Sequence, residues 1–307
     1  MSKPLVSLLM AAWQPRPDWL HQAIAGALGQ RDCRVELLIV DDGSPEPVAE
    51  LLRDFDDQRL RTLRVEHSGA AAAKNAGIAA STGDYLRFID ADDLIEPTST
   101  SRLLDLCDGR EDVIAYGATM FCDDELRPIW KMTSRVQGDA VKACLLGRFT
   151  ARPHAFLFPR RVIEATGQWS TEIKVAEDWD FVLRALEHAE VRGTDHVMTY
   201  YRRHPQGATS SAEEGDRGAN YVLDRYFERH PEERGTKLER QARARTLALI
   251  GRTWATHGQR RKGIRLLARA AALDPRAVWV EFRQALPAGA GRLRRRFTQT
   301  EPARPSG

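Results

Sequence analysis

The sequence predicts an α/β domain, built on a mixed, mostly parallel sheet flanked by helices, followed by an α-helical C-terminal appendage. In the first hundred residues short apolar runs alternate with helical patterns, which is typical of strand–helix–strand units. From residue 220 to about 285 nearly every segment is typical of helix. Of the 307 residues, 42% are hydrophobic and 29% are charged, an ordinary balance for a globular chain.

The first half shows the alternation most clearly. Apolar runs predict strands, of which those at 5–10 and 36–40 are expected to be buried on both faces, and recurrences three and four residues apart predict helices between them. Strands are expected at residues 5–10, 36–40, 60–65 and 85–89, with helices at 18–29, 48–55 and 70–80. Ligands of such sheets gather where the strands end at their carboxyl edge.

After residue 93 the pattern loosens. Helical segments are expected at 98–107, 138–146, 160–166 and 177–189, strands at 113–120 and 156–158, and a hairpin or loop at 122–135. Residues 207–218 are small and polar and indicate a mobile loop or linker. We therefore expect two domains, residues 1–215 and 216–307, the second containing a helical hairpin of residues 242–257 and 260–272.

The net charge of +3 hides an asymmetry. Residues 220–307, the basic C-terminal region, carry 20 basic and 8 acidic side chains, whereas residues 1–219 carry 26 and 35. Such a split indicates a second partner, either an anionic membrane surface or a polyanion. The alternative is a solvated helical face rich in arginine.

Several classes of protein are excluded. The longest apolar run, residues 5–13, is too short for a membrane span, which needs about 20 residues. Lys3 before this run could imitate a secretory signal, but residues 14–17 make a poor cleavage site, so we expect a strand. The four cysteines show no paired spacing and are expected to be free thiols in a reducing cytoplasm: Cys33, Cys107, Cys122 and Cys144.

An acidic cluster, Asp90-Ala91-Asp92-Asp93, directly follows a predicted strand. Side chains two residues apart in extended chain point to one side, and paired carboxylates suit Mg²⁺ or Mn²⁺. Three adjacent acids also repel one another, so a cation among them is physically sensible. A surface acidic turn is the alternative.

Three further clusters are weaker alone. Asp41-Asp42 ends a strand and could accept hydrogen bonds from a base or a ribose, or form a plain turn. Lys74 could neutralise a phosphate at the start of a helix, or be merely solvated. Glu177-Asp178 opens a helix, where acids are ordinary dipole partners but could also serve as a general base.

Taken in order, these pieces resemble the family 2 glycosyltransferases of the GT-A (Rossmann-like) fold. The resemblance covers roughly residues 4–205 and leaves the basic C-terminal region outside. The matching segments are Val6-Ser7-Leu8-Leu9-Met10, Val40-Asp41-Asp42-Gly43-Ser44, Lys74-Asn75-Ala76-Gly77, Asp90-Ala91-Asp92-Asp93 and Glu177-Asp178.

The resemblance implies an inverting, metal-dependent transfer of sugar in cell-surface polysaccharide or glycoconjugate assembly. Contacts with the donor, a sugar carried by UDP, GDP or dTDP, would fall to Ala11, Trp13, Asp41, Asp42, Lys74, Asp90 and Ala91. Mg²⁺ or Mn²⁺ would be bound by Asp90, Asp92 and Asp93, with His204 contacting metal or phosphate. Asp178 would be the catalytic base, with Glu177 beside it. The acceptor would be a saccharide or a lipid-linked saccharide, and nucleic acid is not an expected partner.

The sequence departs from the family pattern at one place, and three other classes of protein compete with this interpretation. The family's first strand usually runs into Pro-Thr-Tyr-Asn, whereas residues 11–14 here are Ala-Ala-Trp-Gln, which leaves the donor's base open. Haloacid-dehalogenase-like phosphatases also place an Asp-x-Asp after a strand, but with Thr or Val two residues later, where this chain has Leu94. A nucleotidyltransferase would need glycines after the first strand, and residues 11–17 have none. A catalytically silent nucleotide-sugar binder or scaffold of the same fold is the main alternative.

The expected location is cytoplasmic, with peripheral contact at the inner face of the plasma membrane.

Overall fold

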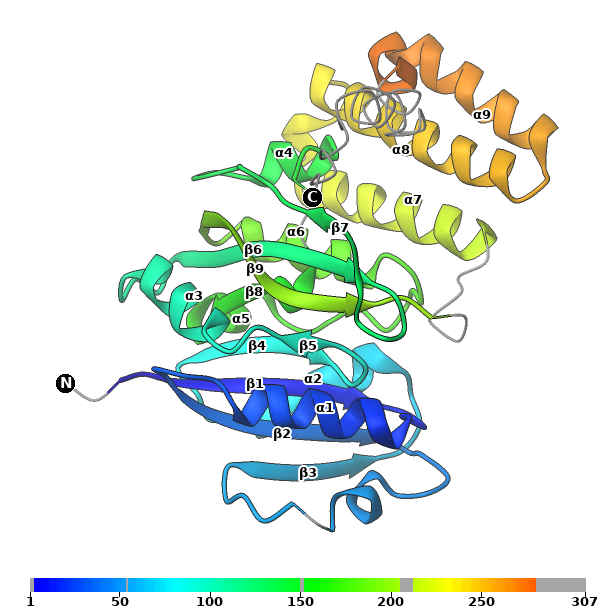
Figure 1. The fold of residues 1–307 in the computed structure, drawn as a ribbon. Coiled ribbons are helices and arrows are strands. Elements are labelled where there is room, and N and C mark those ends of the chain that lie inside the picture. The colour runs from blue at the N-terminus through cyan, green and yellow to red at the C-terminus, as the bar shows by residue number, and fades with distance from the viewer. Residues whose placement is uncertain (1–2, 54, 150–151, 205–211, 280–307) are drawn as a thin grey trace, which may run out of the picture. The chain divides into compact units, whose positions relative to one another are not determined.

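A computed structural model describes residues 3–53, 55–149, 152–204 and 212–279 (Figure 1). The chain divides into two compact units, Met1–Pro231 and Glu232–Gly307. In the described residues of the first unit, one nine-stranded sheet has the order β3-β2-β1-β4-β8-β6-β9-β5, with β7 paired to β6. Within the described residues, no helix is both long and apolar enough to cross a bilayer.

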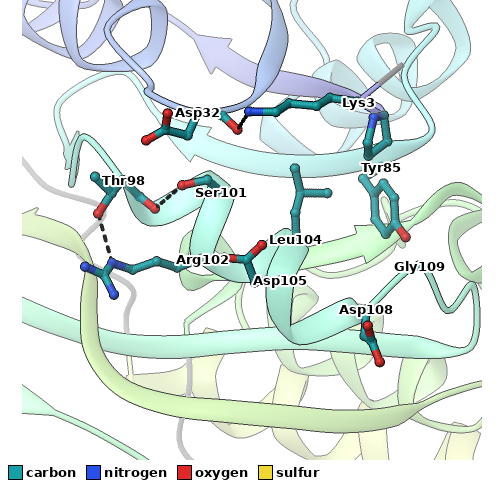
Figure 2. Close-up of a pocket in the computed structure, with 11 residues that line it drawn as sticks. Lys3, Asp32, Tyr85, Thr98, Ser101, Arg102, Leu104, Asp105, Asp108 and Gly109 are labelled. Atoms are coloured by element: carbon teal, nitrogen blue, oxygen red, sulfur yellow. Dashed lines mark hydrogen bonds between the residues drawn. The ribbon is translucent and has the colours of Figure 1, made fainter. Parts of the chain in front are cut away.

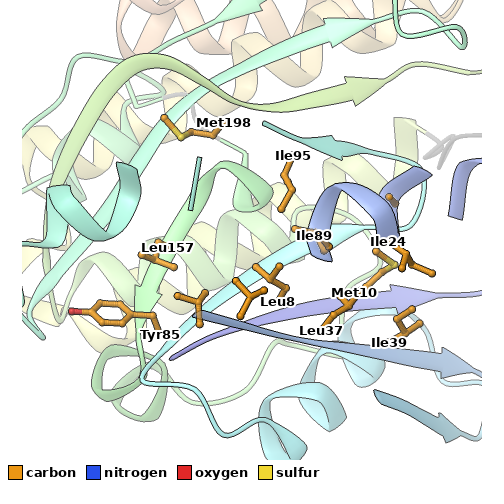
Figure 3. Packing of buried hydrophobic residues seen from close by; sticks show 14 of the residues in the cluster. Leu8, Met10, Ile24, Leu37, Ile39, Tyr85, Ile89, Ile95, Leu157 and Met198 are labelled. Atoms are coloured by element: carbon orange, nitrogen blue, oxygen red, sulfur yellow. The ribbon is translucent and has the colours of Figure 1, made fainter. Parts of the chain in front are cut away.

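The first half of the sheet is parallel, as the sequence predicts. It consists of β1 (Leu5–Ala12), β2 (Arg34–Asp42), β3 (Leu60–Val65) and β4 (Tyr85–Asp90). Both faces of β1, β2 and β4 are mostly buried, because alternate side chains meet different helices, whereas β3 at the edge of the sheet is partly exposed. Leu8, Met10, Leu37 and Ile39 pack with Ile24 of α1 (Pro17–Leu28) (Figure 3).

The opposite face of this half-sheet is covered by α2 (Ala70–Ala80). A Cβ atom on Gly77 of α2 would lie 3.3 Å from Val40 Cγ2 and 3.7 Å from Leu9, so the glycine permits a close approach of the helix to the sheet. The predicted helix at 48–55 is a 3₁₀-helix at Val48–Leu52.

The second half of the sheet is mixed. Here β8 (Phe156–Pro159) is antiparallel to both β4 and β6 (Val113–Cys122), whereas β9 (Glu190–Arg202) is parallel to β6. The two-residue strand β5 (Leu94–Ile95) pairs with β9, and β7 (Pro128–Met132) forms a hairpin with β6. The sequence did not predict β9 or β5. The helices here are α3 (Ser99–Cys107), α4 (Val141–Leu145), α5 (Arg160–Thr166) and α6 (Glu177–Leu186).

The C-terminal boundary differs from the expected one. The second part of the predicted linker at 207–218 belongs to α7 (Ala212–Arg229). Its first part, residues 207–211, lies outside the described residues. Helix α7 belongs to the first unit: Tyr221 Oη lies 3.2 Å from Ser170 Oγ, and Arg229 donates to Glu187 Oε1 at 2.7 Å. The second unit contains the predicted helical hairpin, as α8 (Lys237–Thr256) and α9 (Arg260–Leu273).

Candidate active site

The carboxyl edge of the parallel strands collects the predicted residues. Ala12 at the end of β1 is in register with Asp41, and Ala11 with Asp90 at the end of β4. Because β8 runs antiparallel to β4, the turn before it brings His154 to the same edge. Strand β9 ends at Arg202 beside this edge and delivers His204.

Two histidines face the acidic cluster from these directions. His154 Nδ1 lies 3.3 Å from Asp90 Oδ2 and 3.7 Å from Asp93 Oδ2. His204 Nε2 lies 2.9 Å from Asp92 Oδ2. The backbone N–H of Arg202 donates to Asp93 Oδ1 at 2.8 Å, so β9 fixes the remaining acid.

The three acids differ sharply in their electrostatics. Although burial opposes ionisation of Asp90, the hydrogen bond and charge of His154, with Lys74 and Arg152, lower its pKa to about 2. Burial and the charge of Asp90 raise the pKa of Asp92. Burial, together with the charges of Asp90 and Asp92, raises the pKa of Asp93 well above its ordinary value. The cluster therefore holds more negative charge than its own surroundings neutralise.

The residues present fit a divalent cation. Asp90, Asp93 and His154 each offer a ligand atom, and these atoms lie within 4.8 Å of one another. The side chain of Asp93 is 2% exposed, yet its Oδ2 atom has no hydrogen-bond donor in the described part of the chain. Hidden nitrogens of both histidines, Nε2 of His154 and Nδ1 of His204, likewise have no partner there. A buried carboxylate oxygen without a donor is costly unless a cation or water binds it.

His154 was missed by the sequence analysis, because no recognisable motif surrounds it. Its carbonyl oxygen accepts hydrogen bonds from Arg87 Nε at 3.3 Å and Thr199 Oγ1 at 3.0 Å. Its ring stacks on Tyr201 at a centroid distance of 5.3 Å. The imidazole is thus held from both its backbone and its ring face while Nδ1 points at the acids.

Arg87 anchors this arrangement from inside the protein. The side chain is fully buried, and burial lowers its pKa to about 9, so it remains a cation at neutral pH. Its guanidinium donates to neutral acceptors on two separate segments besides His154: Ser99 Oγ, Thr100 Oγ1, Met198 O and Thr199 Oγ1. It therefore ties the start of α3 and strand β9 to the turn that carries His154.

Asp41 and Asp42 are buried and bound within the chain. Asp41 accepts hydrogen bonds from the N–H groups of Ser44 and Val48 and from Arg64. Asp42 accepts from the N–H groups of Ser68 and Gly69, at 2.8 and 2.9 Å. Both carboxylates thus close the loops after β2 and β3, which is the turn role that the sequence left open.

An exposed aromatic pair lies beside these loops. Trp13 and His67 are 52% and 56% exposed, and their rings stack at a centroid distance of 5.0 Å and an angle of 26°. Gly43 makes room for this arrangement: its φ is +68°, and a Cβ atom there would lie 2.7 Å from the His67 backbone nitrogen. The pair offers a flat surface to a planar ligand.

The first residues of α6 face the acidic cluster across charged side chains. Arg152 lies 3.4 Å from Asp178 Oδ2 and also interacts with Asp90. Burial and the charge of Asp178 raise the pKa of Glu177, while Lys74 opposes the rise. The charge of Lys74 influences the pKa of both Asp90 and Glu177, so Lys74 lies near the acidic cluster and near the first acids of α6.

Lys74 is itself well positioned. Its Nζ atom lies 4.3 Å from the centroid of the Trp169 ring. The next residue, Asn75, bonds the backbone of Trp169 twice, donating to its carbonyl at 3.0 Å and accepting from its N–H at 2.8 Å. The Lys74-Asn75 pair thus joins α2 to the loop that leads to α6.

A separate cavity of about 660 Å³ lies near the start of β1 and β4, at the edge away from the acids (Figure 2). It is lined by Lys3, Tyr85 and polar side chains of α3, and by none of the predicted site residues. Several of these groups bond locally, such as Lys3 Nζ to the Asp32 carbonyl at 2.9 Å and Arg102 to Thr98. We do not assign the predicted chemistry to this cavity.

Known proteins resemble this chain in sequence. One similar protein is the uncharacterized glycosyltransferase EpsJ of Bacillus subtilis (strain 168), 27% identical over 218 residues, which are 67% of this chain and 63% of EpsJ. Another is the succinoglycan biosynthesis protein ExoO of Rhizobium meliloti (strain 1021), 32% identical over 106 residues, which are 34% of this chain and 30% of ExoO. The chain spans less than two thirds of the length of either relative.

The fold also has solved counterparts. TarS of S. aureus (residues 1–349) in complex with UDP-GlcNAc superposes with a TM-score of 0.58, at 14% identity, over 88% of this chain and 90% of that one. The same protein in complex with UDP gives 0.53 at 16% identity, over 90% and 89%. The curled, mixed sheet with its helices therefore has the GT-A fold, as predicted.

The model of "Glycosyl transferase family 2" matches residues 7–167. This range includes the ends of β1, β2 and β4, the Lys74 helix and the turn of His154, and it stops before Glu177. Since the match extends over more than half of the chain and its fold is the expected one, the protein belongs to glycosyl transferase family 2.

Proposed function

We propose that this protein transfers a sugar from a nucleoside-diphosphate sugar to an acceptor hydroxyl, with inversion, in the assembly of a surface polysaccharide or glycoconjugate. The observation that carries the proposal is the buried Asp93 Oδ2 atom, which has no hydrogen-bond donor among the described residues. It belongs to an acidic cluster that interacts electrostatically with Lys74 and lies near the first acids of α6. The relatives support the polysaccharide context, since ExoO is a succinoglycan biosynthesis protein.

Asp90, Asp92 and Asp93, with His154 and His204, are the residues that would hold Mg²⁺ or Mn²⁺. Such a cation would neutralise the diphosphate of the donor and the charge that grows on it as it leaves. Lys74 would add a positive charge on the same side.

The donor's base has a candidate platform in Trp13 and His67. Asp41 and Asp42 would act mainly by holding the loops that form this platform, while Ala11 and Ala91 would leave room beside Asp90. Because TarS was solved with UDP and UDP-GlcNAc, a uridine donor is the first to test, before GDP and dTDP.

The transfer itself needs one base. Asp178, oriented by Arg152, would accept the proton of the acceptor hydroxyl as that oxygen bonds to the anomeric carbon. The bond from that carbon to the diphosphate oxygen breaks at the same time, and attack from the opposite face inverts the configuration. Glu177, whose pKa is raised, is a neighbour that could shape the charge around the base.

Titration calorimetry with UDP, GDP and dTDP, with and without Mn²⁺, tests the binding step. Donor hydrolysis or transfer by the Asp178→Asn and Glu177→Gln variants tests the assignment of the base. We expect cation-dependent binding of one nucleotide, and a loss of turnover of about 100-fold or more in Asp178→Asn with its nucleotide affinity retained. Turnover unaffected by Asp178→Asn would refute this role.

The alternative, a catalytically silent nucleotide-sugar binder, gives a different result. In that case the cation-dependent affinity would be present, but no donor would be hydrolysed and no acceptor glycosylated by the wild-type protein. The charge asymmetry extends the proposal to a peripheral membrane contact of the basic C-terminal region near a lipid-linked acceptor.

A further inference from the structure

Helix α9, orange in Figure 1, is unusually basic. Its 14 residues contain five cations and no acid. The cations are Arg260, Arg261, Lys262, Arg265 and Arg269. A continuous run of one sign makes this helix the most direct candidate for the anionic partner that the charge split indicates.

The helix has two distinct faces. Gly263, Leu266 and Ala270 are buried, and a Cβ atom on Gly263 would lie 2.6 Å from the Gly251 carbonyl oxygen of α8. The backbones of the two helices therefore touch, which fixes the rotation of α9 within the second unit. Arg261 and Arg265 are exposed, whereas Lys262 Nζ lies 3.3 Å from the centroid of the Trp254 ring of α8.

The outward face combines charge with an apolar side chain. Arg261, Ile264, Arg265 and Ala268 are spaced three and four residues apart and are all exposed. Ile264 is 64% exposed, the largest exposed fraction recorded for a large hydrophobic side chain in the described residues. An isoleucine between arginines is typical of helices that lie in a membrane interface.

Among the described residues, the two arginines of this face also lack acidic neighbours. In the described part of the chain, no carboxylate lies within ion-pair distance of Arg261 or Arg265. By contrast, two arginines of the first unit are neutralised locally, Arg59 by Asp57 at 2.6 Å and Arg110 by Asp112 at 2.8 Å. The charges of Arg261 and Arg265 are therefore available to an external anion.

We propose that the outer face of α9 binds a membrane surface rich in anionic lipid headgroups, with Arg261 and Arg265 on the headgroups and Ile264 in the interface. A lipid surface explains the exposed isoleucine, which a nucleic acid or another soluble polyanion would not require. The biological role of this binding rests on the proposed function, because a lipid-linked acceptor would lie in the same membrane surface. Binding to vesicles can nevertheless be measured without any turnover.

The test is flotation of the full chain with two kinds of vesicle, phosphatidylcholine alone and an equal mixture of phosphatidylcholine and phosphatidylglycerol. We expect binding to the anionic mixture only, weakened by added salt. Since each basic side chain near such a surface contributes roughly fivefold in affinity, R261Q/R265Q should lower the partition coefficient about 25-fold. The single variant Ile264→Ser should also lower the partition coefficient, without changing the charge of the helix.

R59Q/R110Q is the matched control, because it removes the same charge from arginines that already have partners. It should bind vesicles like the wild type. Equal partition of R261Q/R265Q and the wild type, or equal binding to neutral vesicles, would overturn the inference. So would wild-type protein that binds RNA or heparin but no vesicles.

Failure of this inference and failure of the proposed function remain distinct. Nucleotide titration of R261Q/R265Q with Mn²⁺ should match the wild type, since none of the proposed nucleotide- and cation-binding residues belongs to α9. Vesicle binding by a wild-type protein that binds no nucleotide would refute the proposed function and leave the lipid surface standing.

Discussion

The substitution Gly218→Ala, which adds a single methyl group, should disturb the candidate site by displacing the backbone that precedes Glu177 and Asp178. Gly218 lies in α7, and a Cβ atom there would come within 2.0 Å of the Val175 carbonyl oxygen and 3.4 Å of Ala176 Cβ. Restoring a normal contact requires the carbonyl to retreat by roughly 1 Å or more. Val175 and Ala176 directly precede Glu177 and Asp178, so this movement would be passed to both acids.

The expected magnitude follows from two opposing effects. Replacing a helical glycine by alanine gains about 1 kcal/mol of helix propensity. Overpacking against a backbone atom costs about 1–3 kcal/mol, so Gly218→Ala should lower the free energy of unfolding by up to about 2 kcal/mol. A displacement of about 1 Å at a reacting group costs on the order of 100-fold in rate, so turnover should fall more than stability.

Gly215 provides the matched control, because it lies on the same helix and a Cβ atom there meets nothing within 4 Å. Urea unfolding should show Gly215→Ala to be more stable than wild type by up to about 1 kcal/mol, with donor hydrolysis unchanged. The packing argument fails if Gly218→Ala unfolds and turns over like Gly215→Ala.

Three other outcomes are expected. Burial opposes ionisation of Asp41, but the hydrogen bonds from Ser44 and Val48, with Arg64, lower its pKa below the ordinary 3.8, so the stability it contributes is present above that pH and lost below it. Asp41→Asn should therefore cost about 1–3 kcal/mol in urea unfolding at neutral pH and show a weaker loss in acid; parallel pH profiles would contradict this. Iodoacetamide should modify the half-buried Cys33 of the native protein before the buried thiols, because burial raises the pKa of Cys107 and of Cys144 to about 12; equal rates by mass spectrometry would argue against the described burial. Trp13→Ala should weaken nucleotide binding about tenfold in calorimetry, and an unchanged affinity would remove the proposed base platform.

The parallel half of the fold could be predicted from sequence because its signals are local. Helix α2 and strand β3 have the predicted bounds, and the apolar run before Asp90 is a strand. The N-terminal run after Lys3 is a strand, and the four thiols are free. The strands are determined by short apolar runs, a signal that depends only on neighbouring residues.

Strand β9 could not be predicted in this way. Its middle contains Arg192, Thr194, Asp195 and His196, which interrupt any apolar alternation. It is a strand because it pairs with β6 along its length and with β5, and pairing between distant segments overrides local preference. The beginning of α7 was missed for a related reason, since Gly218 there provides close packing and not a flexible link.

The same distinction applies to the candidate site. The acids at 90–93 follow a strand, Lys74 lies in the first half of α2 and Glu177-Asp178 open a helix, so motif spacing was sufficient to propose them as site residues. His154 comes to Asp90 only because β8 runs antiparallel to β4, a direction that strand–helix alternation does not reveal. A lone histidine in an unremarkable turn gave no signal by which it could have been found.

The hydrogen bonds of Arg87 have a consequence for how the chain assembles. Its acceptors come from residues 99–100, 154 and 198–199, so they are separated by as many as a hundred positions along the chain. Until the acceptors at residues 198–199 have been synthesised and have folded against β4, the Arg87 guanidinium stays hydrated. The face of β4 that carries Arg87 then remains exposed to water. The two halves of the sheet should thus melt as one cooperative block, and a fragment that stops short of residue 198 should leave β4 exposed to solvent and to aggregation.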